Sequence, residues 1–184
     1  SEFFLLRDPI APWATDIIIG RLRAAFEARG ADPDRQIVVL PWLSAERFLG
    51  LLDVCDIYLD CPSFSGYTTV WQALHRGIPV VTMEGEWMRR RLAAGLLRQI
   101  GLPDTIASSP DEYVALAVEL ARELRDPDLR ALKRAAISHG ARRADGNVDV
   151  VRGFEAALLT ELAMRGRCVE NQPGQEVANV ADQA

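Results

Sequence analysis

The chain has 184 residues, of which 49% are hydrophobic and 26% charged, with a mean hydropathy of +0.01. This composition is typical of a soluble globular protein, and it excludes disorder or a fibrous repeat for the body of the chain. The 21 basic residues are outnumbered by 26 acidic ones, which leaves a net charge of −5. Because proteins that bind the nucleic-acid backbone are usually basic, we expect no nucleic-acid partner.

The cysteines and histidines do not form a metal motif. Cys55, Cys61 and Cys168 lack the spacing of zinc ligands, and only two histidines accompany them. We therefore expect no metal and no cofactor, and we expect a cytoplasmic location, where thiols stay reduced. No apolar run approaches the roughly 20 residues that span a bilayer, so no membrane span is expected. The abrupt start at Ser1, without a methionine, predicts a fragment of a longer protein.

Short apolar runs alternate with segments of helical spacing along the chain. The strands expected from these runs are residues 3–6, which we expect to be buried, and 36–40, 56–60, 78–83 and 105–107. The first expected helix is capped by Thr15 and stops at Gly30, and the second is capped by Ser44. Further helices are expected over residues 68–75, 86–100, 109–124, 128–142 and 148–165.

This alternation is typical of an α/β fold with a Rossmann-like parallel sheet flanked by helices. We predict one such domain over residues 1–165 and a disordered tail over residues 166–184, which lack periodicity. In a parallel sheet, ligands bind beyond the carboxyl ends of the strands. The loops after Leu6, Leu40, Leu59 and Met83 are therefore the places where a site is expected.

The loop after Leu59 contains the sequence Gly66-Tyr67-Thr68-Thr69 at the start of a predicted helix. Free amides of a first helical turn, the helix dipole and the threonine hydroxyls together favour an anion such as a phosphate. A glycine at this point lets the backbone approach a ligand. On spacing alone, an ordinary turn glycine followed by a helix cap explains the same residues equally well.

This stretch resembles the nucleotide-sugar site in the carboxyl-terminal half of GT-B glycosyltransferases. It is most similar to the O-GlcNAc transferase and SPINDLY-like family, including its bacterial members attached to tetratricopeptide repeats. The matching residues are Leu6, Arg7, Pro9, 34–37, Leu59, Asp60, Pro62, Gly66, Thr68, Thr69, Ala73, Leu74, Gly77, 79–83, Gly85, Glu86 and Arg89 or Arg91. They extend the resemblance over about residues 3–165.

The resemblance implies that Thr68 and Thr69, with their backbone amides, hold the diphosphate of a UDP-sugar, and that Gly66 leaves room for it. Tyr67 stands where the family commonly has a histidine that contacts phosphate or sugar. Gln72 stands where the family usually has an acidic residue that accepts hydrogen bonds from the ribose. An amide oxygen still accepts such a bond, but the charge-assisted strength is lost, so we expect weaker or altered nucleotide binding.

The same resemblance implies a nucleoside-binding segment after the second expected strand. Trp42 and Leu43 belong to a loop that flanks the uracil, and Phe48 falls near a position that packs on the nucleoside. Packing inside the protein is the competing interpretation for Trp42 and Phe48, and we favour it for Phe48. Ala45 stands where some members place a phosphate-binding lysine.

The implied function is the donor-binding lobe of a transferase that moves a GlcNAc-like sugar or a hexose from a UDP-sugar to a protein or glycan acceptor. The implied partners are an amino-terminal GT-B lobe and tetratricopeptide repeats of the parent protein, without which we expect no transfer. A catalytically dead lobe retained for protein interaction is a second possibility. A retaining GT-B enzyme is a third, but Ser65 and Gln72, at a spacing comparable to that of its Glu-x7-Glu pair, provide no carboxylate.

Overall fold

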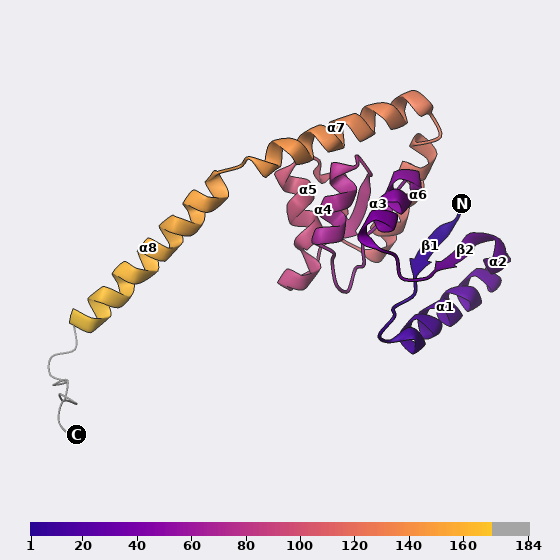
Figure 1. The fold of residues 1–184 in the computed structure, drawn as a ribbon, viewed down its shortest axis with the longest axis horizontal. Helices are drawn as coiled ribbons and strands as arrows, with labels where there is room; N and C mark the ends of the chain where they lie inside the picture. The colour runs from indigo at the N-terminus through magenta and orange to yellow at the C-terminus, as the bar shows by residue number, and fades with distance from the viewer. Residues whose placement is uncertain (171–184) are drawn as a thin grey trace, which may run out of the picture. The chain divides into compact units, whose positions relative to one another are not determined.

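The computed structural model describes residues 1–170, with side chains described as far as Arg165, and it divides into two compact units. The first unit, Ser1–Ala141, alternates strands with helices (Figure 1). Its elements are β1 (Phe3–Leu6), α1 (Pro12–Glu27), α2 (Pro33–Gln36), β2 (Ile37–Leu40), α3 (Ala45–Val54), β3 (Tyr58–Leu59), α4 (Thr68–His75), β4 (Val80–Met83), α5 (Leu92–Gln99), β5 (Ile106–Ala107), α6 (Pro110–Glu123) and the greater part of α7 (Pro127–Asp145). Two 3₁₀ turns, Met88–Arg90 and Pro103–Thr105, precede α5 and β5.

The second unit begins at Arg142 and contains α8 (Asp149–Glu170). The side chain of Asn147 accepts a hydrogen bond from the Asp149 amide at 2.9 Å, at the start of this helix. The last five residues of α8 belong to the stretch that the sequence predicts to be a tail, and the rest of that stretch lies outside the described residues. The domain boundary at residue 165 stays a prediction.

All strand pairs of the first unit are parallel, which confirms the predicted α/β class. β1 pairs with β2 in a register that runs from Phe3 opposite Ile37 to Leu6 opposite Leu40. The other three strands form a second sheet in the order β3-β4-β5. The carboxyl ends of β3 and β4 therefore lie at one edge, beside the loops in which the sequence predicts a site.

Three expectations about local structure are wrong. β1 is not buried, because Phe3 and Phe4 remain 38% and 37% exposed. α1 starts at Pro12, whose fixed φ suits a first helical turn, and the Thr15 hydroxyl instead accepts a hydrogen bond from the Asp8 amide at 3.0 Å. The helix expected over residues 86–100 is divided into a 3₁₀ turn and α5 at Arg91.

The core of the first unit is built around β4, whose four residues are all buried. Val81 packs with Leu120 and Leu124 in one cluster, which places α6 and its end against the sheet. Successive residues of a strand point to opposite faces, so Val80 and Thr82 face away from this cluster. α4 and α5 also contact β4, so helices flank the strand that lies beside the candidate site.

Gly77 closes α4 in a conformation that requires glycine. Its φ is +72°, and its amide donates to the Leu74 carbonyl at 2.9 Å. A Cβ at this position would lie 2.5 Å from the carbonyl oxygen of Arg134 on α7. The backbone of α7 can pass this close to the end of α4 only because residue 77 has no side chain.

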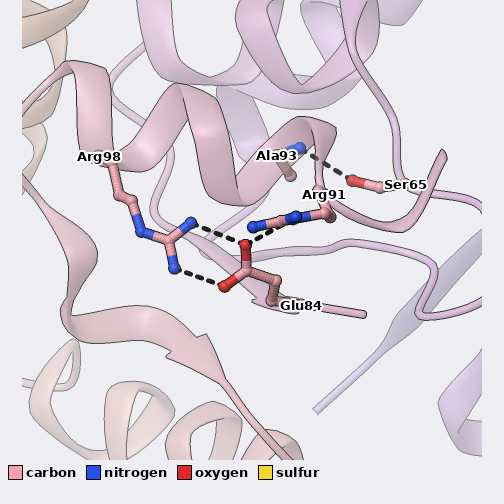
Figure 2. A network of polar contacts seen from close by, with 5 residues as sticks. All are labelled: Ser65, Glu84, Arg91, Ala93 and Arg98. Atoms are coloured by element: carbon pink, nitrogen blue, oxygen red, sulfur yellow. Dashed lines mark hydrogen bonds and ion pairs between the residues drawn. The ribbon is translucent and has the colours of Figure 1, made fainter. Parts of the chain in front are cut away.

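A charged cluster joins the end of β4 to α5 (Figure 2). The Glu84 carboxylate accepts hydrogen bonds from Arg98 at 2.9 Å and from Arg91 at 3.0 Å. These guanidinium donors, Arg98 first, lower the pKa of Glu84 from 4.5 to about 2. The cluster therefore adds stability only while Glu84 is ionised.

Among the described residues, none of the helices combines the length and the apolar character needed to cross a bilayer.

We expect Gly77→Ala to destabilise the chain strongly. The left-handed φ alone costs an alanine about 1 kcal/mol, and the contact with the Arg134 backbone adds roughly 1–3 kcal/mol. Gly30→Ala and Gly101→Ala are matched controls, because both glycines have a positive φ but open space around the missing Cβ. Equilibrium urea unfolding should show a larger loss in the free energy of unfolding for Gly77→Ala than for the two controls. Equal losses in all three variants would contradict the packing argument.

The Glu84 cluster predicts a stability that falls in acid. The folded pKa of about 2 lies below the usual 4.5, so the contribution is present above about pH 4.5 and is lost as the pH falls towards 2. We expect Glu84→Gln to be less stable than wild type by about 1 kcal/mol at pH 7, with the two curves converging near pH 2. Urea unfolding across this pH range measures the difference. The exposed neighbour variant Glu86→Gln should follow wild type, and a constant offset at all pH values would refute the assignment.

Candidate functional site

The amino terminus of α4 presents backbone donors at the carboxyl edge of the sheet. Tyr67 is its N-cap residue, and no side chain caps the helix. The first backbone bond of the helix runs from the Trp71 amide to the Tyr67 carbonyl at 2.8 Å. The preceding first-turn amides have no carbonyl to bind within the helix, and the dipole makes this end positive. Together with the exposed Thr68 hydroxyl, they can hold an anion.

Thr69 is less accessible than Thr68. Its hydroxyl lies 2.9 Å from the phenolic oxygen of Tyr58, and either oxygen can donate in this pair. Burial raises the pKa of Tyr58, which keeps the phenol protonated. Of the two hydroxyls that the family resemblance assigns to the diphosphate, the structure therefore exposes that of Thr68 and tethers that of Thr69 to β3.

Gly66 lies against the first turn of α4. A Cβ at this residue would lie 2.9 Å from the Thr69 hydroxyl oxygen and 3.1 Å from the Val70 Cγ2. The missing side chain therefore makes room for the helix itself, whereas the resemblance assigned that room to a ligand. The Gly66 amide is also engaged, because it donates to the Asp60 carboxylate at 2.7 Å.

Asp60 is the buried polar centre of this region, with 2% of its surface exposed. Besides Gly66, its carboxylate accepts hydrogen bonds from the hydroxyls of Ser65 and Thr82, each at 2.7 Å. Its backbone carbonyl accepts a bond from the Tyr113 hydroxyl at 2.9 Å. Burial raises the pKa of Tyr113, and the nearby Asp60 charge adds to this effect. Four segments of the chain thus meet at one residue.

Ser65 connects this region to α5. Its hydroxyl oxygen accepts a bond from the Ala93 amide at 2.9 Å, so Ser65 caps α5 from a distant loop (Figure 2). The Ser65 amide donates to the Arg89 carbonyl at 2.8 Å, and the Arg90 Nε donates to the Pro62 carbonyl at 2.8 Å. The loop that precedes α4 is therefore bonded both to Asp60 and to the 3₁₀ turn Met88–Arg90.

The resemblance includes Asp60 and Thr82 among its matching residues, but sequence reasoning gave no role in the site to Asp60, Ser65 or Thr82. The available signal was polarity, since Asp60 ends one apolar stretch and Thr82 interrupts another, whereas Ser65 lies in a polar loop. A buried polar side chain needs a partner, which predicts that such residues bond to something. The partner itself cannot be read from the sequence, because Asp60 and Thr82 are separated by 22 positions.

Gln72 lies in a hollow of about 450 Å³ between α3 and α4. The hollow is lined by Leu49, Asp53, Trp71, Gln72, His75 and Arg76. Asp53 and Arg76 form an ion pair across it at 2.6 Å, and the rings of Trp71 and His75 pack edge to face with centroids 5.0 Å apart. The Gln72 amide thus faces a space that is partly apolar and partly charged.

The predicted nucleoside-binding residues lie on and before α3. Trp42 is 64% exposed, whereas Leu43 and Phe48 are half-buried. Ser44 caps α3 as expected, accepting a bond from the Arg47 amide at 3.4 Å. Phe48 precedes Leu49, which reaches the hollow of Gln72. In the part of the chain that the structure describes, no hydrogen bond joins Trp42, Leu43 or Phe48 to the start of α4.

Within residues 1–170, no three His, Cys, Asp or Glu side chains are grouped as metal ligands. The donors of the candidate site are amides and hydroxyls, which suit an anion.

Comparison with known proteins gives a consistent match. The sequence profile of glycosyl transferase family 41 matches residues 4–147. The probable UDP-N-acetylglucosamine–peptide N-acetylglucosaminyltransferase SPINDLY of Petunia hybrida is 32% identical over 113 residues, covering 61% of this chain and 12% of that protein. A UDP-N-acetylglucosamine–peptide N-acetylglucosaminyltransferase of Caenorhabditis elegans is 36% identical over 109 residues, covering 59% of this chain and 9% of that protein.

A solved structure supports the same relationship at the level of the fold. A mutant of the O-GlcNAc transferase of Thermobaculum terrenum superimposes with a TM-score of 0.65 at 28% identity. The match covers 89% of this chain and 30% of the transferase, so the chain corresponds to a part of such a protein. Since the family profile extends over most of the first unit and the architecture agrees, this chain belongs to glycosyl transferase family 41.

Proposed function

We propose that the chain is the donor-binding lobe of a glycosyltransferase that moves a GlcNAc-like sugar or a hexose from a UDP-sugar to a protein or glycan acceptor. The observation that carries this proposal is the uncapped amino terminus of α4, with the exposed Thr68 beside it, in a chain of family 41. The two relatives reported above are named as UDP-N-acetylglucosamine–peptide N-acetylglucosaminyltransferases, one of them as probable. These names support a UDP-sugar as donor.

The chemical task of this lobe is to stabilise the leaving group. When the bond between sugar and phosphate breaks, negative charge develops on the departing diphosphate. Oriented amides and hydroxyls stabilise such charge without reorganising at the moment of reaction. The first-turn amides of α4 and the Thr68 hydroxyl supply these donors, and Tyr67 lies next to them, where it can contact the phosphate or the sugar.

The nucleoside is proposed to lie beside α3 and α4. Gln72, in the hollow between these helices, would accept a hydrogen bond from a ribose hydroxyl. Trp42 and Leu43 would flank the uracil, with Phe48 packing against the nucleoside from the first turns of α3. The half-burial of Phe48 also fits a packing role inside the protein.

The parent protein would complete the site. Sugar transfer needs two lobes that close over the donor, exclude water and orient the acceptor. This chain spans 30% of the matched solved transferase, so we propose that it binds nucleotide weakly and transfers no sugar alone. The proposed partners are an amino-terminal GT-B lobe and tetratricopeptide repeats, in a bacterial protein of the cytoplasm that uses no cofactor.

A non-catalytic lobe retained for protein interaction is the second candidate. The replacement of the usual acidic residue by Gln72, and of a lysine by Ala45, favours it because both reduce the affinity for a nucleotide. A retaining enzyme is not supported, since Ser65 carries a hydroxyl and Gln72 an amide, so neither supplies the carboxylate that such an enzyme needs.

Calorimetric titration with UDP, ADP and GDP tests the donor-lobe proposal. We expect selective binding of UDP, and a roughly tenfold or larger rise in Kd for Thr68→Ala/Thr69→Ala, because hydrogen bonds to charged groups contribute about 1.5–3 kcal/mol each. Thr160→Ala on α8 is the matched control, since its hydroxyl bonds only within the helix, to the Ala156 carbonyl.

Two results would count against the proposal. Equal affinity for all three nucleotides would refute the uridine assignment. No binding at millimolar UDP, both for this chain and after the upstream lobe is supplied, would favour the non-catalytic interpretation.

Replacing Gln72 tests the ribose assignment separately. We expect Gln72→Glu to lower the Kd for UDP about tenfold, because a carboxylate accepts a charge-assisted bond that is roughly twice as strong as a neutral one. The same substitution should leave the binding of inorganic pyrophosphate unimproved, since pyrophosphate has no ribose. Equal effects on both ligands would show that Gln72 does not contact the ribose.

A further inference from the structure

We propose that Asp60 is a positioning residue of the anion site, acting through the loop that leads into α4. Its buried carboxylate accepts hydrogen bonds from Gly66 and Ser65. Through these two residues, it fixes the position of the first-turn amides of α4. This inference rests on the proposed function for its ligand, a nucleoside diphosphate, but the positioning itself is a property of the unliganded chain.

The carboxylate accepts three hydrogen bonds, two from the loop and one from β4. Its Oδ1 accepts the Gly66 amide at 2.7 Å, and its Oδ2 accepts the hydroxyls of Ser65 and Thr82 at 2.7 Å. Asp60 itself is fixed, because its amide donates to the Val81 carbonyl at 2.9 Å within the β3–β4 pairing. A buried carboxylate is tolerated only when it is bonded in this way, so the loop and the residue stabilise one another.

The charge also fixes the direction of the neighbouring hydrogen bonds. An ionised carboxylate can only accept, so the hydroxyl of Ser65 must donate to it. The lone pairs of the Ser65 oxygen then remain for the Ala93 amide, 2.9 Å away at the start of α5. An uninterrupted series of hydrogen bonds thus runs from β3 through the loop to α5.

Tyr58 of β3, the strand that Asp60 directly follows, holds the other end of the same segment. Tyr58 and Asp60 are two positions apart, and alternate residues of a strand point to the same face. Asp60 binds Gly66, and the Tyr58 hydroxyl lies 2.9 Å from that of Thr69. The four residues from Gly66 to Thr69, which carry the proposed phosphate donors, are therefore held at both ends by one strand face.

The alternative is that Asp60 is merely a negative charge near the site, and the two roles predict opposite effects. Removing a nearby negative charge strengthens the binding of an anion. A looser loop instead weakens the binding of an anion, because the donors are no longer held in the binding geometry before the anion arrives. Asp60→Asn separates the two, since it keeps the shape of the side chain but removes the charge. The bond to the Gly66 amide then loses its charge-assisted strength, and an amide donor faces the hydroxyl groups of Ser65 and Thr82.

The first measurement needs no ligand. In amide hydrogen exchange followed by NMR, we expect the exchange rate of the Gly66 amide, divided by that of the Val81 amide in β4, to rise at least tenfold in Asp60→Asn. The Val81 amide corrects for the lower global stability of the variant. An unchanged ratio would overturn the proposal.

The second measurement is UDP affinity. We expect the Kd to rise about tenfold in Asp60→Asn. Thr82→Val is the matched control, because it removes a bond to the same carboxylate from β4 and leaves the loop contacts in place. It should reduce the thermal midpoint as Asp60→Asn does, yet keep the Kd within twofold of wild type.

Tighter UDP binding in Asp60→Asn, or equal weakening in Thr82→Val, would refute positioning. If wild type binds no UDP, either alone or with the upstream lobe supplied, the donor-lobe proposal fails, and the exchange of the Gly66 amide alone then decides the role of Asp60.

Discussion

The buried carboxylate of Asp60 is the interaction on which the candidate site depends. It lies at the end of β3, where the backbone leaves the sheet, and there it bonds to the loop and to β4. Without these bonds the carboxylate would be an unpaired buried charge, which costs several kcal/mol. The loop and the buried carboxylate therefore stabilise one another. Together they fix the position at which α4 starts.

The sheet supplies the frame for this arrangement. Parallel strands end at a common edge, and β4 is buried along its whole length between helices. The helix after β3 must start close to that edge, since only eight residues separate Leu59 from Thr68. Gly66 lets this short loop pass against the first turn of the helix, and Gly77 lets α7 pass its other end. Close backbone approaches thus position α4 at both ends.

Sequence reasoning succeeds here where the signals are local. The bounds of α4, the cap Ser44 and the parallel class follow from periodicity and from residues near one another in the chain. It fails where the partner is distant. The exposure of β1 depends on what covers it, and Ser65 caps α5 across 28 positions, which no local pattern encodes. The same reasoning predicted the helix start at Thr68, but it could not show that the Thr69 hydroxyl is bonded to Tyr58.

The charge balance of this region supports the proposal that the chain alone binds a diphosphate only weakly. A helix terminus contributes about half a positive charge, whereas a nucleoside diphosphate carries about two to three negative ones. Nearby cations are largely engaged, since Arg91 pairs with Glu84 and the Arg90 Nε bonds to the Pro62 carbonyl. The single lysine, Lys133, pairs with Glu123 at 2.9 Å. In the proposed function, the amides of α4 would orient the leaving group, and groups beyond this loop would neutralise most of its charge.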